Sequence, residues 1–256
     1  MGRYSIRNGS IAASLPSKRR AGEPGLLLKS RSMTKTEGLK IAVEGAVEVS
    51  GLLLQPEDAR WLMLLAHGAG AGMRHPFMER LAGELAGVGI ATLRYQFPYM
   101  EEQRGRPDSP ATLTATVAAA MHAAKQNPAN LPLLAGGKSM GGRMSSHAAA
   151  EGLIPGVRGL IFFGFPLHPP NRPGSKRADH LAKVPVPMLF LQGTRDTLAD
   201  LKLLEPIVKG LGGNGKLHII ESADHGFHVL KRSGKTDASV LTELARTAAE
   251  WAKKLP

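Results

Sequence analysis

The sequence contains no cysteine among its 256 residues. This absence excludes disulfide bonds, thiolate metal sites and catalysis by a cysteine nucleophile. No segment approaches the run of about 20 apolar residues that a membrane-spanning helix needs. The basic residues at the start of the chain are not followed by the apolar stretch of a secretory signal. We therefore expect a cytoplasmic protein with no membrane partner.

Acidic residues are scarce at the start of the chain, so the net charge of +12 is unevenly distributed. Residues 1–40 contain nine Lys or Arg and two acidic residues, whereas residues 41–256 contain 24 basic and 19 acidic residues without interleaved aromatics. We expect residues 1–38, which lack apolar periodicity, to form a disordered basic tail. The Lys18-Arg19-Arg20 cluster suits an anionic surface or a solvated tail, and Met33 is an alternative start. We expect no nucleic-acid partner.

Residues 39–256 have the pattern of one α/β domain, with an ordinary hydrophobic fraction of 43% for the whole chain. Alternating apolar residues between positions 41 and 54 predict two antiparallel strands. Short apolar runs predict further strands at 61–66, 89–94, 133–136, 157–163, 186–191 and 216–220. Helical spacing predicts helices at 76–87, 110–125, 141–151, 199–209 and 237–254. This alternation predicts a mostly parallel sheet with helices on both faces.

A G-x-S-x-G motif, Gly137-Lys138-Ser139-Met140-Gly141, joins a predicted strand to a predicted helix. Such a turn holds the serine oxygen above the sheet edge and needs glycine where a Cβ would collide with neighbouring elements. We therefore predict that Ser139 is a nucleophile. The motif alone is equally compatible with a packing turn in which Ser139 caps the helix. A phosphate-binding loop is disfavoured, because Pro132 stands where that motif needs glycine.

A serine nucleophile needs a base, and the base needs a group that fixes its tautomer. Asp196 follows the predicted strand at 186–191, and His225 follows the one at 216–220. Both therefore emerge at the same sheet edge as Ser139. Asp200 and His228 are alternatives for the acid and the base. We expect Asp224 to bind backbone N–H groups of its own loop.

Hydrolysis of an acyl bond also needs donors for the oxyanion that forms on the carbonyl oxygen. We assign one to the backbone N–H of Met140, because it lies at the start of the helix that follows the nucleophile. The glycine-rich turn His67-Gly68-Ala69-Gly70 follows an earlier strand, and we assign the second donor to the Ala69 N–H. This turn is also compatible with a flexible loop of no chemical purpose.

The segments HGAGAGM, GGKSMGGR, FFGFPLHPP, QGTRDTL and ADHGFHV resemble the α/β-hydrolase superfamily, in the branch around testis-expressed protein 30 and dienelactone-hydrolase-like proteins. The resemblance covers residues 39–256. It implies an α/β-hydrolase fold with about eight strands, and the order nucleophile, acid, base along the chain. The implied residues are Ser139, Asp196 and His225, with oxyanion amides at Ala69 and Met140. Typical dienelactone hydrolases use a cysteine nucleophile, so their specific activity is not implied.

The Pro-rich segment Phe165–Pro170 stands where larger relatives insert a helical lid, so we expect a minimal lid and an open site. This segment either lines the substrate pocket or is a rigid connector. Four basic residues near the expected mouth either favour an anionic substrate or serve solubility, namely Arg143, Arg172, Lys176 and Arg177.

We therefore expect a carboxylesterase-like serine hydrolase that acts on an ester or related acyl bond of a small to medium substrate. Its mechanism requires no metal or organic cofactor. The alternative is a non-catalytic α/β-hydrolase-fold protein that binds a partner or a small ligand. The presence of all three triad residue types, in order, favours the enzyme.

Overall fold

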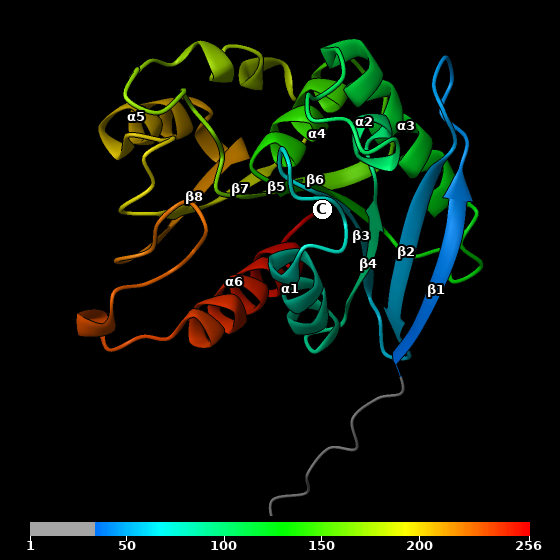
Figure 1. Cartoon of the computed structure of the whole chain (residues 1–256). Coiled ribbons are helices and arrows are strands. Elements are labelled where there is room, and N and C mark those ends of the chain that lie inside the picture. The colour runs from blue at the N-terminus through cyan, green and yellow to red at the C-terminus, as the bar shows by residue number, and fades with distance from the viewer. Residues whose placement is uncertain (1–33) are drawn as a thin grey trace, which may run out of the picture. The chain divides into compact units, whose positions relative to one another are not determined.

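Eight strands form one open sheet in the order β1-β2-β4-β3-β5-β6-β7-β8 (Figure 1). The computed structural model describes residues 34–256. β1 pairs antiparallel with β2 and β2 with β4, whereas the other neighbours are parallel. The strands are β1 (Thr34–Ile41), β2 (Val49–Pro56), β3 (Trp61–Ala66), β4 (Ile90–Tyr95), β5 (Leu133–Lys138), β6 (Val157–Phe163), β7 (Met188–Gly193) and β8 (Gly215–Ile220).

Helices cover both faces of this sheet, which confirms the predicted fold class (Figure 1). One face carries α1 (Pro76–Ala86) and α6 (Asp237–Ala252), and the other carries α3 (Pro110–Lys125), α4 (Met140–Ala150) and α5 (Leu201–Gly210). The short elements are α2 (Pro98–Glu101) and the 3₁₀ turns η1 (Lys176–Ala178), η2 (Leu181–Lys183), η3 (Gly212–Asn214) and η4 (Lys231–Ser233). Within residues 34–256, no helix is long and apolar enough to cross a membrane.

The first strand begins inside the segment that the sequence predicts to be a disordered tail. Residues 34–38 belong to β1 and pair with residues 52–56 of β2, so the predicted boundary at residue 38 is wrong. The segment is polar and gives no apolar signal. An antiparallel ladder is held by backbone hydrogen bonds, however, and an edge strand can keep polar side chains. Residues 1–33, with the Lys18-Arg19-Arg20 cluster and Met33, lie outside the described residues.

The central strands are apolar along their whole length because both of their faces are covered. Every residue of β4 is buried, as is every residue of β3 except Trp61. Such continuous runs are typical of parallel strands between two helical layers. This burial fixes the sheet, and with it the edge where β3, β5, β7 and β8 end.

The connection between β6 and β7, residues 164–187, contains only the short turns η1 and η2. Phe165 and Leu167 are buried in the core, and His168 Nε2 accepts a hydrogen bond from the backbone N–H of Asp200 at 3.0 Å. The Pro-rich segment is thus a connector anchored to the start of α5. The chain has no helical lid in this connection, as the sequence predicts.

Candidate active site

Ser139 stands at a sharp turn between β5 and α4, with φ 51° and ψ −118°. A non-glycine residue at positive φ is strained, and such strain persists only where the surroundings enforce it. Here the turn is pressed against the end of β3. A Cβ on Gly141 would stand 2.5 Å from the carbonyl oxygen of His67, and one on Gly137 would overlap the carbonyl of Ala66. The two glycines of the motif therefore let the turn approach β3.

The three predicted triad residues form one continuous hydrogen-bonded chain. His225 Nε2 lies 2.8 Å from Ser139 Oγ, and His225 Nδ1 lies 2.7 Å from Asp196 Oδ2. The carboxylate of Asp196 can only accept, so Nδ1 carries the proton and Nε2 is free to accept one from Ser139. The ring of His225 is 24% exposed and the side chain of Asp196 is fully buried.

Asp196 is held in place from two sides besides His225. Gln192 Nε2 donates to Asp196 Oδ2, and the backbone N–H of Leu198 donates to Oδ1 at 2.8 Å. The alternative acid, Asp200, is occupied elsewhere, because its side chain caps α5 by accepting from the Lys202 N–H at 2.9 Å. The structure thus brings Asp196, and not Asp200, to His225.

The loop that carries His225 is fixed by two carboxylates. Asp224 Oδ1 accepts from the backbone N–H groups of Gly226 at 2.8 Å and His228 at 2.9 Å, as the sequence predicts. The alternative base, His228, forms an ion pair with Asp237 at 2.7 Å. This pairing raises the pKa of His228 and lowers that of Asp237. His228 is therefore tied to the start of α6, while His225 faces Ser139.

The turn after β3 is positioned by His67, a fully buried residue. Its Nε2 accepts from the backbone N–H of Phe97 at 3.1 Å, so its proton is on Nδ1, which donates to the carbonyl of Gly68 at 2.8 Å. Burial lowers the pKa of His67 to about 4, which keeps the ring neutral. The sequence pattern alone predicts no role for His67, although a histidine stands directly before the glycine-rich turn.

The hydrogen bond from His67 to the Gly68 carbonyl also sets the direction of the Ala69 N–H, one of the two predicted oxyanion donors. The carbonyl of Gly68 and the N–H of Ala69 belong to one peptide unit and point in opposite directions. Because His67 holds the carbonyl, the Ala69 N–H is turned away from the imidazole. A Cβ on Gly68 would stand 3.6 Å from Ser139 Cβ, so this turn lies beside Ser139. Met140 is the first residue of α4, where backbone N–H groups lack helical partners.

A cavity of about 420 Å³ opens onto Ser139 and His225. Its walls are largely apolar, and Phe77 and Phe227 stack in it with ring centroids 5.8 Å apart. Ala69 lines it as well. The charged or titratable side chains in its lining, apart from His225, are Lys138, Arg80, His75, His228 and Asp237.

The four basic residues expected near the mouth of this cavity, Arg143, Arg172, Lys176 and Arg177, do not line it. The Pro-rich segment does not line it either, so of its two predicted roles the structure supports the rigid connector. Arg143 belongs to α4, and the Pro-rich segment and the other three basic residues belong to the connection between β6 and β7. Lys138, the residue before Ser139 in the G-x-S-x-G motif, does line the cavity. Its ammonium is buried, which the sequence does not predict.

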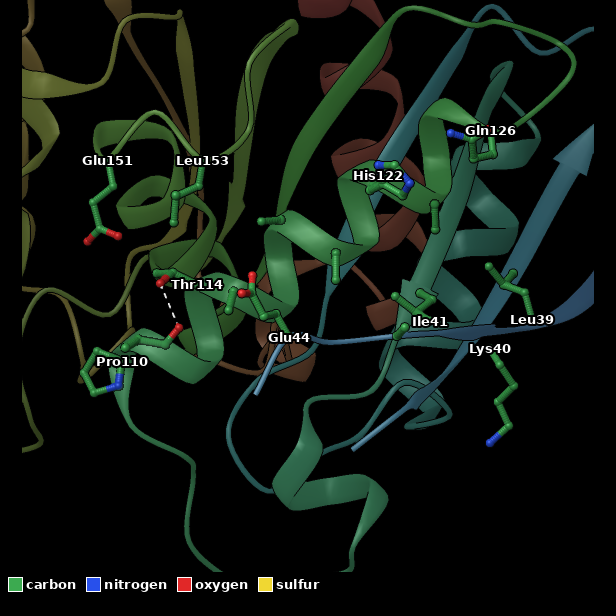
Figure 2. A pocket seen from close by; sticks show the side chains of 16 residues that line it. Leu39, Lys40, Ile41, Glu44, Pro110, Thr114, His122, Gln126, Glu151 and Leu153 are labelled. Atoms are coloured by element: carbon green, nitrogen blue, oxygen red, sulfur yellow. Dashed lines mark hydrogen bonds between the residues drawn. The ribbon is translucent and has the colours of Figure 1, made fainter. Parts of the chain in front are cut away.

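A larger groove of about 900 Å³ lies between α3 and the end of β1. Figure 2 shows its lining, with Thr114 and His122 projecting from α3 and Leu39 and Ile41 from β1. None of the predicted site residues lines it. The smaller cavity is therefore the candidate active site, because it alone of the two is lined by Ser139 and His225, with Gly68 and Ala69 beside them.

Residues 59–253 match the family described as alpha/beta hydrolase domain. Two curated relatives from strains of Mycobacterium tuberculosis, both named as phosphoribosyl transferases, are 29% identical over 214 residues. The alignment covers 82% of this chain but only 44% of each relative, so the chain spans less than half of their length.

Solved structures show the same fold. A dienelactone hydrolase from Anabaena variabilis has a TM-score of 0.69 at 25% identity, covering 87% of this chain and 98% of its own. A lidless α/β serine hydrolase from Xanthomonas campestris has a TM-score of 0.68 at 20% identity, covering 87% and 96%. An esterase domain from Rhodothermus marinus has a TM-score of 0.65 at 15% identity, covering 86% and 99%. With its family match across residues 59–253 and this fold, the chain belongs to the alpha/beta hydrolase domain family.

Proposed function

We propose that this protein is a serine hydrolase that cleaves an ester or related acyl bond of a small to medium substrate. The observation that carries the proposal is the hydrogen-bonded chain from Asp196 through His225 to Ser139. The fold and its serine hydrolase and esterase neighbours support hydrolase activity in general. The triad geometry adds the proposed reaction class.

In the first half-reaction, Ser139 Oγ attacks the acyl carbon and His225 Nε2 takes the hydroxyl proton. Asp196 holds the His225 ring and stabilises the imidazolium that forms. The Ala69 and Met140 N–H groups stabilise the oxyanion of the tetrahedral intermediate. When the intermediate collapses, the proton passes from His225 to the leaving alcohol, and an acyl-enzyme ester remains on Ser139.

In the second half-reaction, water attacks the acyl-enzyme while His225 Nε2 takes one of its protons. Collapse of the second intermediate returns that proton to Ser139 Oγ and releases the carboxylic acid. Every step uses side chains and backbone groups of this chain, and the small acyl substrate is the one partner that the proposal requires.

The proposed size of the substrate follows from the cavity. Its volume of about 420 Å³ lies near the lower end of the range of about 300–1,000 Å³ that is typical of small-molecule sites. The apolar walls suit the carbon skeleton of an ester, and the connection between β6 and β7 adds no helical lid. Short and medium acyl chains therefore fit this site better than long lipids.

The phosphoribosyl transfer named for the mycobacterial relatives is not proposed for this chain. The chain covers 44% of those proteins, and the residues gathered around Ser139 are those of acyl transfer. A non-catalytic binding protein is the second candidate. The hydrolysis experiment described next distinguishes it from the enzyme.

The test is steady-state hydrolysis of p-nitrophenyl acetate, butyrate and palmitate by the full chain and by Ser139→Ala and His225→Gln. We expect turnover of the two short esters, little of the palmitate, and loss of about 10⁴-fold or more in kcat in both variants. Wild-type activity that persists in Ser139→Ala would refute the proposed nucleophile. An inactive wild type that binds these esters unchanged would favour the binding protein.

A further inference from the structure

The ammonium of Lys138 is buried with no hydrogen-bond partner among residues 34–256. Lys138 directly precedes Ser139 and lines the active-site cavity. Buried ammonium groups are normally paired, because removing an unpaired charge from water is costly. The Lys138 ammonium is therefore an unusual group to find beside Ser139.

The Lys138 ammonium, His225 and Asp196 all border the space that a side chain on Gly164 would fill. The position that a Cβ on Gly164 would occupy is 3.2 Å from Lys138 Nζ, 3.4 Å from His225 Nδ1 and 3.5 Å from Asp196 Oδ2. Gly164 has φ +73°, which favours glycine. Glycine at this position thus opens the space in which the cation approaches the pair.

Two aromatic rings also lie close to the Lys138 ammonium. Nζ is 5.8 Å from the centroid of Phe77 and 5.6 Å from that of Phe227. At such distances the ring faces attract a cation, and the attraction is strongest where water is excluded. The rings therefore hold Nζ in place without neutralising its charge.

The charge of Lys138 is set by burial and by two carboxylates. Burial lowers its pKa to about 8, while Asp196 and Asp224 favour the charged form. Near neutral pH the side chain therefore carries its proton, and the site contains a cation whose field acts on its neighbours.

We propose that Lys138 is a positioning residue of the triad whose positive charge opposes protonation of the His225–Asp196 pair and thereby extends activity toward lower pH. This inference rests on the proposed hydrolase function. Protonation of the pair removes the acceptor at His225 Nε2, so that Ser139 cannot lose its proton. A cation beside the pair makes that extra proton less favourable, and the effect is large where both groups are buried.

Other charged and titratable groups around the cavity act more weakly on the pair. His75, which caps α1, and Arg80 of α1 are exposed. His228 and Asp237 offset each other as an ion pair with side chains 71% and 47% exposed. Water and salt screen such groups. The buried charges that face the pair are those of Lys138 and, from the loop of His225, the half-buried Asp224.

The test compares wild type, Lys138→Met and Lys138→Arg by the pH dependence of kcat/KM for p-nitrophenyl butyrate. Hydrolysis is followed at the isosbestic wavelength of nitrophenol, so that the signal does not change with pH. Methionine removes the charge at similar length, whereas arginine keeps it. We expect the acidic midpoint to rise by about one pH unit in Lys138→Met and to stay near the wild-type value in Lys138→Arg. Lys202→Met, which removes an exposed lysine on α5, is the control and should leave the midpoint in place.

A second measurement does not depend on turnover. In an NMR titration of the His225 ring, assigned by its loss in His225→Gln, the midpoint should also be higher in Lys138→Met than in wild type. Thermal unfolding of both proteins is followed as well, and a cooperative transition in Lys138→Met shows that a change in the midpoint does not come from a disrupted fold. Equal midpoints for wild type and Lys138→Met, or an equal shift in Lys138→Arg, would overturn the inference. An inactive wild type in which His225 still shows the shift would instead refute only the proposed hydrolase function.

Discussion

Gly137 lies so close to Ala66 that a Cβ on residue 137 would overlap the Ala66 carbonyl group. This contact seats the turn of Ser139 against the end of β3. We predict that Gly137→Ala lowers the free energy of unfolding by at least about 2 kcal/mol, because the backbone must shift and φ of +149° is unfavourable for alanine.

Urea denaturation of purified protein measures this change. The matched control is Gly83→Ala in α1, where a Cβ would meet nothing within 4 Å. There we expect a gain of about 0.5–1 kcal/mol, since alanine favours the helix. Equal stability of Gly137→Ala and wild type would contradict the close approach.

In the proposed mechanism Asp196 fixes the tautomer of His225, so removal of its carboxylate should lower the rate of the reaction more than the affinity for substrate. We predict that Asp196→Asn lowers kcat by roughly 10⁴-fold with little change in KM, because an amide at this position can donate to His225 Nδ1 and favours the wrong tautomer. Asp200→Asn, which alters only the cap of α5, should keep kcat within about threefold of wild type. Similar losses in the two variants would show that Asp196 has no special role.

His67 predicts how stability responds to acid. Its pKa is lowered to about 4 in the fold, against about 6.5 for an unfolded chain. As the pH drops below about 6.5, the unfolded state takes up a proton on His67 that the folded state does not take up until about pH 4. The free energy of unfolding therefore falls over this range, by roughly 3 kcal/mol from this residue. Burial lowers the pKa of His180 to about 4 as well, and His180 adds to the same slope.

The measurement is the free energy of unfolding in urea at several pH values between these limits, for wild type and His67→Asn. The variant should be less stable near neutral pH, because the Phe97 N–H loses its acceptor and the Gly68 carbonyl loses one of its donors. Its stability should also fall less steeply with acid. A slope as steep as that of wild type would mean that His67 is not the buried neutral group described above.

Much of the fold is predictable from the sequence because it depends on continuous apolar runs. The strands Trp61–Ala66 and Val157–Phe163 and the helix Pro110–Lys125 have the predicted bounds. Strand ends that are polar or rich in glycine are harder to predict from the sequence. β1 begins at Thr34 because backbone pairing with β2 suffices, and β5 extends to Lys138 because Gly137 and Lys138 still pair with β6.

Part of the candidate site is also predictable from the sequence. The positions of Ser139, Asp196 and His225 follow from the topology, since all three stand just beyond strand ends at one sheet edge. The contacts of His67 and the burial of the Lys138 ammonium depend on segments distant in the sequence, such as Phe97 and Gly164, and no local pattern reveals them. For the same reason, the basic residues expected at the cavity mouth lie elsewhere.

The most direct test of the central claim is labelling of the native full chain with a fluorophosphonate probe, followed by mass spectrometry of the intact protein and its peptides. An activated serine is required for this reaction, so heat-denatured protein serves as the control. We predict one adduct per chain, located on Ser139, that is absent from Ser139→Ala and strongly slowed in His225→Gln. An unlabelled wild type, or an adduct on another residue that persists in Ser139→Ala, would contradict the assignment of Ser139 as the nucleophile.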